Sequence, residues 1–201
     1  MEQHRLILLR HGETEWSLSG QHTSRTDLDL TATGREQAKL AADALATLTL
    51  TDPWVVASPL RRATVTAELA GLTVNEVSPL LCEWDYGDYE GLTTAQIREE
   101  VPDWLVWSHG CPGGESPGDV SDRADRAIAH AMEHLSTRDV LFVGHGHFSR
   151  AVLTRWAQLP IGEGIRFAMT AASIAVCGHE HGVRQIGALG LTGHRHPCLP
   201  E

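Results

Sequence analysis

Two apolar runs of the sequence end in the same pattern, a histidine followed by a glycine. Leu6-Ile7-Leu8-Leu9 leads into Arg10-His11-Gly12, and Val140-Leu141-Phe142-Val143 leads into Gly144-His145-Gly146. Four consecutive large apolar residues are typical of a strand that is buried on both faces of a parallel sheet. Because ligands bind outside the carboxyl ends of such strands, the pattern predicts a pocket in which imidazoles and a guanidinium face an anion.

A third apolar run adds cations to the same end of the predicted sheet. Trp54-Val55-Val56-Ala57 leads into Ser58-Pro59, a predicted N-cap followed by a proline at the first helical position. Arg61 and Arg62 would lie in the first turn of that helix, whose backbone N–H groups favour an anion. Arg10 and either Arg61 or Arg62 could then hold a phosphoryl group bidentately.

These residue types indicate phosphoryl-transfer chemistry, in which charge spreads over three oxygens and catalysis depends on positioning and fixed cations. The residues leave the nucleophile open among water, serine, aspartate and histidine. Neighbouring guanidinium groups lower the pKa of an imidazole from about 6.5, which favours a neutral, nucleophilic histidine. The acidic segment 81–91 contains candidates for the acid that protonates the leaving oxygen. The sequence lacks a Gly-x-x-x-x-Gly-Lys-Ser/Thr loop, so a nucleoside triphosphatase is not predicted.

Short apolar runs alternate with segments of helical periodicity, which predicts an α/β fold. We expect a three-layer αβα sandwich with a mostly parallel central sheet, formed by one domain over residues 1–201 whose tail frays after about Gly193. Segments 16–29 and 104–118 are predicted to be irregular. The predicted strands are 6–9, 54–57, 74–77, 140–143, 173–177 and 184–189, and the predicted helices run from a Thr33 cap to Leu48, from a Ser58 cap to Gly71, from Thr93 or Thr94 to Glu99, from Val120 to Leu135 and from Phe148 to Leu159.

Composition limits the class of protein and its partners. Among the 201 residues, 16 Lys and Arg against 26 Asp and Glu give a formal net charge of −10. Such an acidic surface repels nucleic acid and anionic lipid, so neither is expected as a partner. No apolar run approaches the roughly 20 residues of a membrane span, and the N-terminal run is too short for a secretory signal, so we expect a cytoplasmic protein.

The cysteines and the histidine pairs do not predict a metal site. The His-x-His pairs at 179/181 and 194/196 lack a carboxylate or thiolate framework, and we interpret them as incidental. The cysteines lack Cys-x-x-Cys spacing and are expected to be reduced thiols; they are Cys82, Cys111, Cys177 and Cys198.

Five motifs occur in order along nearly the whole chain. They are Leu9-Arg10-His11-Gly12-Glu13-Thr14, Leu30-Thr31 through Gly34 and Ala38, Ser58-Pro59-Leu60-Arg61-Arg62-Ala63 with Thr66-Ala67, Glu83 with Gly87 and Glu90-Gly91, and Gly144-His145-Gly146. Together they resemble the motifs of the histidine phosphatase superfamily, which includes cofactor-dependent phosphoglycerate mutases and many acid phosphatases. The resemblance implies a phosphoglycerate mutase-like fold and phosphatase chemistry.

The resemblance also implies residue roles. His11 would be the phosphorylated nucleophile and Glu83 the proton donor, with Glu13 and Asp85 as alternatives for the acid. In the family the arginine directly before alanine binds phosphate, which selects Arg62 over the neighbouring arginine. No metal or other cofactor would be needed. The implied phosphate-binding set is Arg10, Ser17, Thr23, Ser24, Arg62, Glu83, His145 and Gly146.

Residues outside these motifs indicate a branch of the family. Many members carry asparagine and glycine where this chain has Ser17 and Ser24. The runs 15–27, 83–91 and 110–116 resemble a branch that contains sugar bisphosphatases and bacterial acid phosphatases. Phosphoglycerate mutases tend to carry a longer insertion after the proton donor, which favours hydrolysis here.

We therefore expect a phosphomonoesterase with acid phosphatase activity on small phosphorylated substrates. Three alternatives stay open: a sugar-bisphosphate phosphatase of narrow specificity, a 2,3-bisphosphoglycerate-dependent phosphoglycerate mutase, and an inactive phosphate-binding module. The last has no need of Glu83, which argues against it. Edge strands in this fold make a homodimer a further expectation.

Overall fold

The computed structural model of the chain describes residues 4–193. The predicted fraying after Gly193, the His194/His196 pair and Cys198 lie outside these residues. Within them, no helix combines the length and the apolar character needed to cross a bilayer.

Six strands form one sheet with the order β3-β2-β4-β1-β5-β6. β1 and β2 pair in parallel with β4, and β3 pairs in parallel with β2, whereas β5 runs antiparallel to β1 and to β6. The expected mostly parallel sheet is confirmed, with an antiparallel extension at one edge. The strands span Leu6–Arg10 (β1), Trp54–Ala57 (β2), Glu76–Val77 (β3), Val140–Gly144 (β4), Ile174–Glu180 (β5) and Val183–Leu191 (β6).

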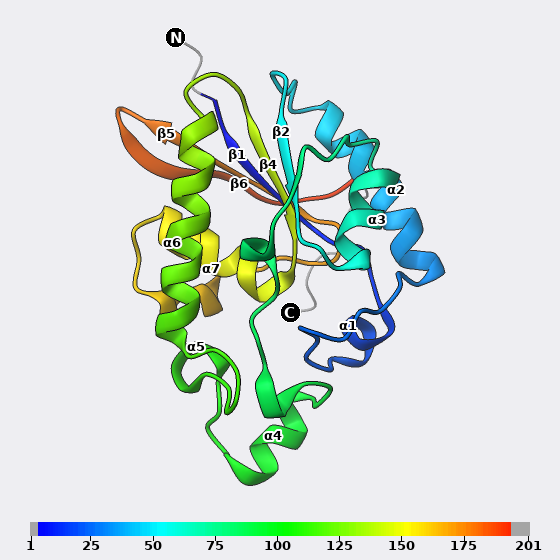
Figure 1. Ribbon diagram of the computed structural model, residues 1–201, viewed down its shortest axis with the longest axis vertical. Coiled ribbons are helices and arrows are strands. Elements are labelled where there is room, and N and C mark those ends of the chain that lie inside the picture. Colours follow the sequence, from blue (N-terminus) through cyan, green and yellow to red (C-terminus); the bar gives the residue numbers. More distant parts are fainter. Residues whose placement is uncertain (1–3, 194–201) are drawn as a thin grey trace, which may run out of the picture.

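Helices cover both faces of this sheet (Figure 1). α2 and α3 pack on one face, α6 and α7 pack on the other, and α4 and α5 lie beyond the carboxyl ends of the parallel strands. This is the predicted three-layer αβα sandwich. The helices span Glu15–Ser19 (α1), Ala32–Ala46 (α2), Arg61–Leu69 (α3), Thr94–Glu100 (α4), Val106–His109 (α5), Pro117–His134 (α6) and Gly146–Trp156 (α7), with 3₁₀ turns at Pro79–Leu81 (η1), Gly87–Tyr89 (η2) and Ile161–Arg166 (η3).

β1 contributes to both hydrophobic cores. Leu6 and Leu8 pack with residues of α6 and α7, whereas Ile7 and Leu9 pack with residues of α2 and α3. All four side chains are at most 1% exposed. Because successive side chains of a strand point to opposite faces, a continuous apolar run fits a strand that is covered on both sides. The run therefore buries β1 in the middle of the molecule and leaves its polar end at the rim of the sheet.

The carboxyl ends of β1 and β4 form a topological switch point. The two strands are neighbours, but the chain leaves β1 toward α2 on one face and leaves β4 toward α7 on the other. A crevice forms between such strands at their carboxyl ends, where ligands bind in open α/β sheets. His11 and His145 directly follow these strands, so the topology brings them together from distant parts of the chain.

Two glycines let the loop after β1 contact the first turn of α2. A Cβ atom on Gly12 would lie 2.2 Å from the carbonyl oxygen of Gly34, and a Cβ atom on Gly34 would lie 2.1 Å from that of Glu13. Side chains at these positions would separate the loop from the helix. Gly12, the glycine of the Arg-His-Gly pattern, thus lets the loop after β1 pack closely on α2, and this packing fixes the position of His11.

Four predicted helix starts were wrong. α2 begins after Thr31 rather than Thr33, because the side chain of Thr31 accepts the backbone N–H of Gly34. α3 follows Leu60, which makes no side-chain cap, so the predicted cap at Ser58 is not the start of the helix. α6 begins at Pro117 after a Ser116 cap, three residues earlier than the predicted Val120. α7 begins at Gly146, two residues earlier than predicted.

Two short helices lie in segments that were predicted to be irregular. α1 has 5 residues and α5 has 4 residues. Hydrophobic periodicity becomes visible only over a longer window, so helices of this length leave no such signal. α1 is instead fixed by a capping box, in which Thr14 and Ser17 exchange hydrogen bonds.

Candidate active site

A cavity of about 200 Å³ opens at the carboxyl ends of β1 and β4. Guanidinium groups, imidazoles, one carboxylate and small polar side chains share its wall, which suits a small anionic ligand. The lining residues are Arg10, His11, Thr14, Trp16, Ser17, Gly20, Gln21, His22, Thr23, Glu83, Tyr86, Gly146, His147, Arg150 and Met169.

His11 presents one ring nitrogen to this cavity. Its Nδ1 lies 2.6 Å from the carbonyl oxygen of Gly12, and because a carbonyl only accepts, Nδ1 carries the proton. Nε2 therefore holds a lone pair, and it makes no hydrogen bond within residues 4–193. Burial lowers the pKa of His11 well below its ordinary value, and the charges of Arg10 and Arg62 lower it further. The imidazole is thus neutral and able to act as a nucleophile at neutral pH.

Arg10 is fixed at the wall of the same cavity. One of its η nitrogens donates to the carbonyl oxygen of Met169 over 2.5 Å. Its Nε is buried and has no hydrogen-bond partner in the described part of the chain. A fixed cation in the cavity wall favours binding of an anion there.

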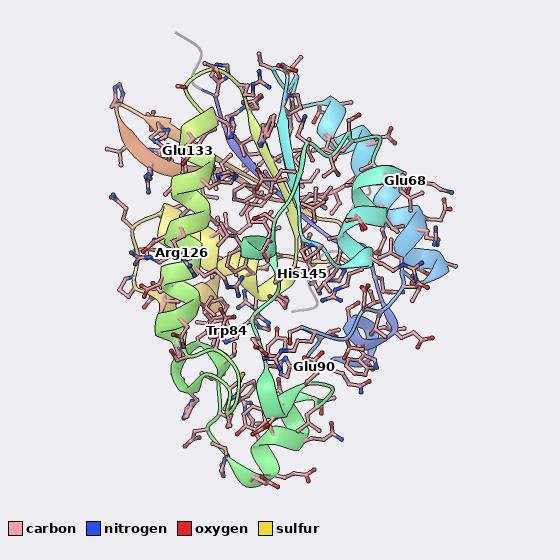
Figure 2. All side chains as sticks on the ribbon, in the orientation of Figure 1. Glu68, Trp84, Glu90, Arg126, Glu133 and His145 are labelled. Carbon is pink, nitrogen blue, oxygen red and sulfur yellow. The ribbon has the colours of Figure 1, made fainter. Side chains whose placement is uncertain are left out.

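Arg62 and His145 form a hydrogen-bonded chain behind His11. Arg62 Nε donates to Nδ1 of His145 over 3.2 Å, so the proton of His145 is on Nε2, which lies 2.8 Å from Oγ of Ser58. The rings of His11 and His145 meet edge to face, with centroids 5.2 Å apart. Arg62 and His145 are at most 1% exposed and do not line the cavity; His145 is labelled near the middle of the view in Figure 2. They form the layer directly beneath the cavity floor.

The remaining donors of Arg62 fix the loop in front of it. They reach the carbonyl oxygens of Thr23, Ser24 and Thr26 at 3.3, 3.1 and 2.9 Å. The charge of Arg62 also lowers the pKa of His145, second to burial. Arg62 therefore has two effects, since it shapes the loop that carries Thr23 and keeps the imidazoles above it neutral.

Glu83 lies at the N-terminus of α7, which explains how a carboxylate is held inside the cavity wall. Oε1 accepts the backbone N–H groups of Trp84 and Phe148 at 2.8 and 2.7 Å, and Oε2 accepts that of His147 at 3.0 Å. Free N–H groups at a helix start favour such an anion. Oε2 of Glu83 thus accepts one backbone N–H, whereas Oε1 accepts two.

The two alternative acids lie elsewhere. Asp85 forms an ion pair with Arg25, and the carboxylate of Glu13 accepts the hydroxyl of Thr31 at 2.7 Å. Neither residue lines the cavity. Among the lining residues that the structure describes, Glu83 is the only carboxylate.

The start of α3 does not contribute to the cavity, contrary to prediction. The backbone N–H of Arg61 donates to Asp27 over 2.9 Å, and its guanidinium forms an ion pair with Asp29 at 3.1 Å on the surface. The carboxylate of Asp27 thus already occupies this helix start. Of the two arginines in this turn, Arg62 points inward, as the family resemblance implies.

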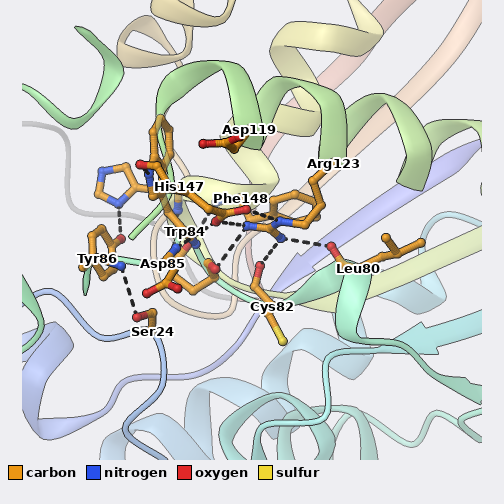
Figure 3. Close-up of polar contacts among 12 residues, drawn as sticks. Ser24, Leu80, Cys82, Trp84, Asp85, Tyr86, Asp119, Arg123, His147 and Phe148 are labelled. Carbon is orange, nitrogen blue, oxygen red and sulfur yellow. Dashed lines mark hydrogen bonds and ion pairs between the residues drawn. The ribbon is translucent and has the colours of Figure 1, made fainter. Parts of the chain in front are cut away.

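Arg123 on α6 holds the segment that carries Glu83 (Figure 3). Its guanidinium donates to the carbonyl oxygens of Leu80, Cys82 and Glu83 at 3.0, 2.7 and 3.2 Å, and to both carboxylate oxygens of Glu115. The side chain is 10% exposed. A buried bidentate pair of this kind fixes a segment that has no regular structure of its own.

The three predicted hydroxyl ligands differ in position. Ser17 and Thr23 line the cavity, although the hydroxyl of Ser17 also bonds the backbone of Thr14. Ser24 does not line it, because its N–H and its hydroxyl both bind the carboxylate of Glu90. Gly146 lines the cavity at the first residue of α7. The structure thus brings six of the nine predicted residues to the cavity and sets Arg62, His145 and Ser24 behind it.

Nine residues of the cavity wall were not among the predicted site residues, and four of them carry titratable side chains: His22, Tyr86, His147 and Arg150. The hydroxyl of Tyr86 lies 2.6 Å from Nδ1 of His147 (Figure 3), and His22 stacks near Tyr86 with ring centroids 4.6 Å apart. Burial lowers the pKa of His22 to about 4. Arg150 is the fourth residue. His147 and Arg150 follow Gly146 at the expected strand end, and a helix predicted two residues earlier would have placed both beside the site.

No group of three or more His, Cys, Asp or Glu residues within positions 4–193 is arranged to hold a metal ion.

Comparison with known proteins assigns the chain to a family. Residues 6–192 match the histidine phosphatase superfamily (branch 1). An acid phosphatase of Mycobacterium tuberculosis is 66% identical over 197 residues, which cover 98% of this chain and 97% of that protein. A sedoheptulose 1,7-bisphosphatase of Saccharomyces cerevisiae is 33% identical, with 78% of this chain and 69% of that protein covered. The solved structure of an open reading frame product of M. tuberculosis has a TM-score of 0.95 at 67% identity, covering 96% of this chain and 100% of that one.

The chain belongs to the histidine phosphatase superfamily. It is a phosphatase of that superfamily, and its substrates are small phosphorylated molecules. The fold and the activity class that the sequence motifs imply are thereby confirmed.

Proposed function

We propose that the protein hydrolyses phosphate monoesters through a phosphohistidine on His11, with Glu83 as the acid and then the base, and without a metal. The observation that carries the proposal is the state of His11. Its Nδ1 proton is held by the carbonyl of Gly12, so the free Nε2 faces a cavity that also contains Glu83 and Arg10.

The reaction has two balanced steps. Nε2 of His11 attacks phosphorus as the ester P–O bond breaks, and protonated Glu83 gives its proton to the departing oxygen. Water then gives a proton to the Glu83 carboxylate while its oxygen attacks phosphorus, and the P–N bond breaks. This step releases inorganic phosphate and returns both residues to their starting states.

Fixed cations stabilise the charge that develops on the transferred group. Arg10 contributes its charge at the cavity wall, and Arg62 contributes its charge from the layer beneath. Such preorganised groups need no rearrangement at the moment of reaction, which is the main source of catalysis in phosphoryl transfer. Thr23 also lines the cavity, and its hydroxyl donates to the carbonyl oxygen of Gln21 over 3.2 Å.

Substitution of His11 tests the proposal. His11→Ala should lower kcat on p-nitrophenyl phosphate by at least about 10³-fold, since removal of a nucleophile has effects of this size or larger. Circular dichroism should show an unchanged fold. His181→Asn is the matched control, because His181 lies in the exposed β5–β6 turn at a positive φ that asparagine tolerates. Full activity in His11→Ala would contradict the mechanism.

A narrow sugar-bisphosphate phosphatase is the second candidate, and it is favoured by the similarity to the yeast sedoheptulose 1,7-bisphosphatase. Initial rates on a panel of sugar phosphates, sugar bisphosphates, phosphoglycerates and nucleotides separate the two candidates. A broad acid phosphatase hydrolyses most of the panel, whereas the narrow enzyme accepts bisphosphates alone. Interconversion of phosphoglycerates that depends on 2,3-bisphosphoglycerate would instead indicate a mutase.

We further infer that the enzyme does not bind nucleic acid, since its net charge is −10. A cytoplasmic location stays a prediction. A homodimer stays a prediction, and analytical ultracentrifugation checks it.

A further inference from the structure

Arg150 is a cation of the cavity wall that the proposed reaction does not use. It is the fifth residue of α7, one turn after the N–H groups that bind Glu83, and it lines the same cavity as His11 and Arg10. Long side chains on a helix point back toward its N-terminus, which directs Arg150 toward the site.

The guanidinium of Arg150 is held in place by two contacts from other segments. Its Nε donates to the carbonyl oxygen of Gly164 over 3.0 Å, and its Cζ lies 4.7 Å from the ring centroid of Trp107. A Cβ atom on Gly164 would lie 2.2 Å from that ring, so only glycine brings this carbonyl so close. The plane of the guanidinium is thus fixed before any ligand binds.

The two η nitrogens of Arg150 have no hydrogen-bond partner within residues 4–193. When an arginine is held through Nε and through the face of its guanidinium, its two η nitrogens stay available as a fork of donors. Their spacing matches the two oxygens of a carboxylate or of a phosphate. Glu83 is the one carboxylate of the cavity wall, and its oxygens already accept three backbone N–H groups. The anion that fits the fork is therefore one that the substrate brings.

We propose that Arg150 binds a second anionic group of the substrate, a carboxylate or a second phosphate, while His11 and Arg10 engage the phosphate that is transferred. This inference rests on the proposed function. It assigns the preferred substrates to phosphate esters of small acids and to bisphosphates, with the two anions close enough to share a cavity of about 200 Å³. Arg150 is then a specificity-determining residue.

Matched substrates test this assignment. Glycerol 3-phosphate and 3-phosphoglycerate differ only in a carboxylate, and fructose 6-phosphate and fructose 1,6-bisphosphate differ only in a second phosphate. In each pair we measure the ratio of kcat/KM for the substrate with the extra anion to that of its partner. The wild type should give a ratio of roughly 10 to 100 in at least one pair, the effect of a charge-assisted hydrogen bond. The first pair identifies a carboxylate and the second a phosphate.

Arg150→Met should bring that ratio close to one, mainly through a higher KM for the substrate with the extra anion. Arg150→Lys, which keeps the charge without the fork, should give an intermediate ratio and is the second variant if Arg150→Met does not fold. Arg155→Met is the matched control on the same helix, since Arg155 pairs with Asp125 on the surface. It should keep the wild-type ratio.

Two outcomes would overturn the assignment. One is a wild-type ratio near one in both pairs. The other is an Arg150→Met enzyme that loses activity equally on both members of each pair, which would show a structural or catalytic effect. Failure of the proposed function looks different, because no phosphohistidine would then form on His11 in the wild type with p-nitrophenyl phosphate.

Discussion

His11 and His145 have nearly the same sequence neighbours, but their hydrogen bonds differ. His145 uses both ring nitrogens, one toward Arg62 and one toward Ser58, whereas His11 uses only Nδ1. An imidazole attacks through a free lone pair, so only His11 can act as a nucleophile in this arrangement. His145 instead lies between Arg62, which donates to its Nδ1, and the ring of His11.

Glu83 is expected to affect substrates according to their leaving group. Glu83→Gln cannot donate the proton, so kcat on alkyl phosphates should fall by roughly 10²-fold or more, the usual contribution of general acid catalysis. Aryl phosphates such as p-nitrophenyl phosphate leave without a proton and should be affected less in the first step. The measurement is kcat for both classes.

A matched control for this variant is Glu99→Gln, an exposed glutamate on α4. The glutamine at position 83 would also present its amide N–H₂ to one of three backbone donors, which should lower the free energy of unfolding by about 1–3 kcal/mol. Equal losses on alkyl and aryl phosphates at the first step would argue that another group is the acid.

At the scale of elements, the site depends on how α6 and α7 hold the irregular segment 82–85. The start of α7 binds the carboxylate of Glu83, and Arg123 of α6 binds the backbone of the same segment. Glu83 is thereby held through both its carboxylate and its carbonyl oxygen, although the backbone of the segment forms no helix or strand. Two neighbouring helices supply the rigidity that an acid catalyst needs.

Arg123→Met should lower the free energy of unfolding by about 3–5 kcal/mol, because it leaves the carboxylate of Glu115 unpaired. As a positioning residue, Arg123 should lower kcat more than it changes KM. The double variant Arg123→Met/Glu115→Met should recover part of the stability and none of the activity. Denaturant unfolding and steady-state kinetics measure these effects.

Arg126→Met is the matched control, since Arg126 is three residues further along the same helix and is exposed (Figure 2). A loss of stability in Arg123→Met without any loss of kcat would refute the positioning role.

The sequence predicts the strands and helices that contain long apolar runs. It does not predict the ends of helices or the orientation of side chains where tertiary contacts determine them. The apolar runs of β1 and β4 each predict a buried strand that is followed by a histidine. The position of His11 at a strand end can therefore be predicted from the sequence. The start of α2 does not, because Thr31 and Thr33 are both suitable caps, and contacts of Thr31 with Glu13 decide between them. Arg123 lies among the aspartates of segment 119–125, so the sequence gives no sign that its side chain is buried.

The proposed role of Arg150, unlike its position near the site, could not have been assigned from sequence for a related reason. The residues that hold it, Trp107 and Gly164, come from a short helix and a 3₁₀ turn with no readable periodicity. Only the folded chain brings these three residues together. The sequence therefore predicts the nucleophile and the proton donor, whereas the walls that select the substrate require the structure.

At the scale of the whole molecule, four neutral histidines make stability depend on pH. Burial lowers the pKa of His11, His22, His145 and His147, that of His22 to about 4. Below pH 6.5 the unfolded chain takes up protons that the folded chain resists, so stability should fall as the pH falls from about 6.5 to about 4. For His22 alone the loss is about 3 kcal/mol over this range.

The free energy of unfolding between pH 7.5 and pH 4.5 measures this dependence. His22→Gln, which cannot titrate, should show a shallower decrease than the wild type. His109→Gln is the control, since His109 is exposed on α5. A free energy that stays constant or rises as the pH falls through this range would contradict the assignment of neutral buried histidines.

The most direct test of the whole account is the covalent intermediate. The enzyme is mixed with a ³²P-labelled phosphate monoester, quenched in base within milliseconds and digested for mass spectrometry. The account predicts an acid-labile, base-stable phosphoryl group on Nε2 of His11, absent from His11→Ala and formed and consumed at rates compatible with kcat. Turnover with no phosphorylated His11 at any time, or a phosphoryl group on another residue that is kinetically competent, would contradict it.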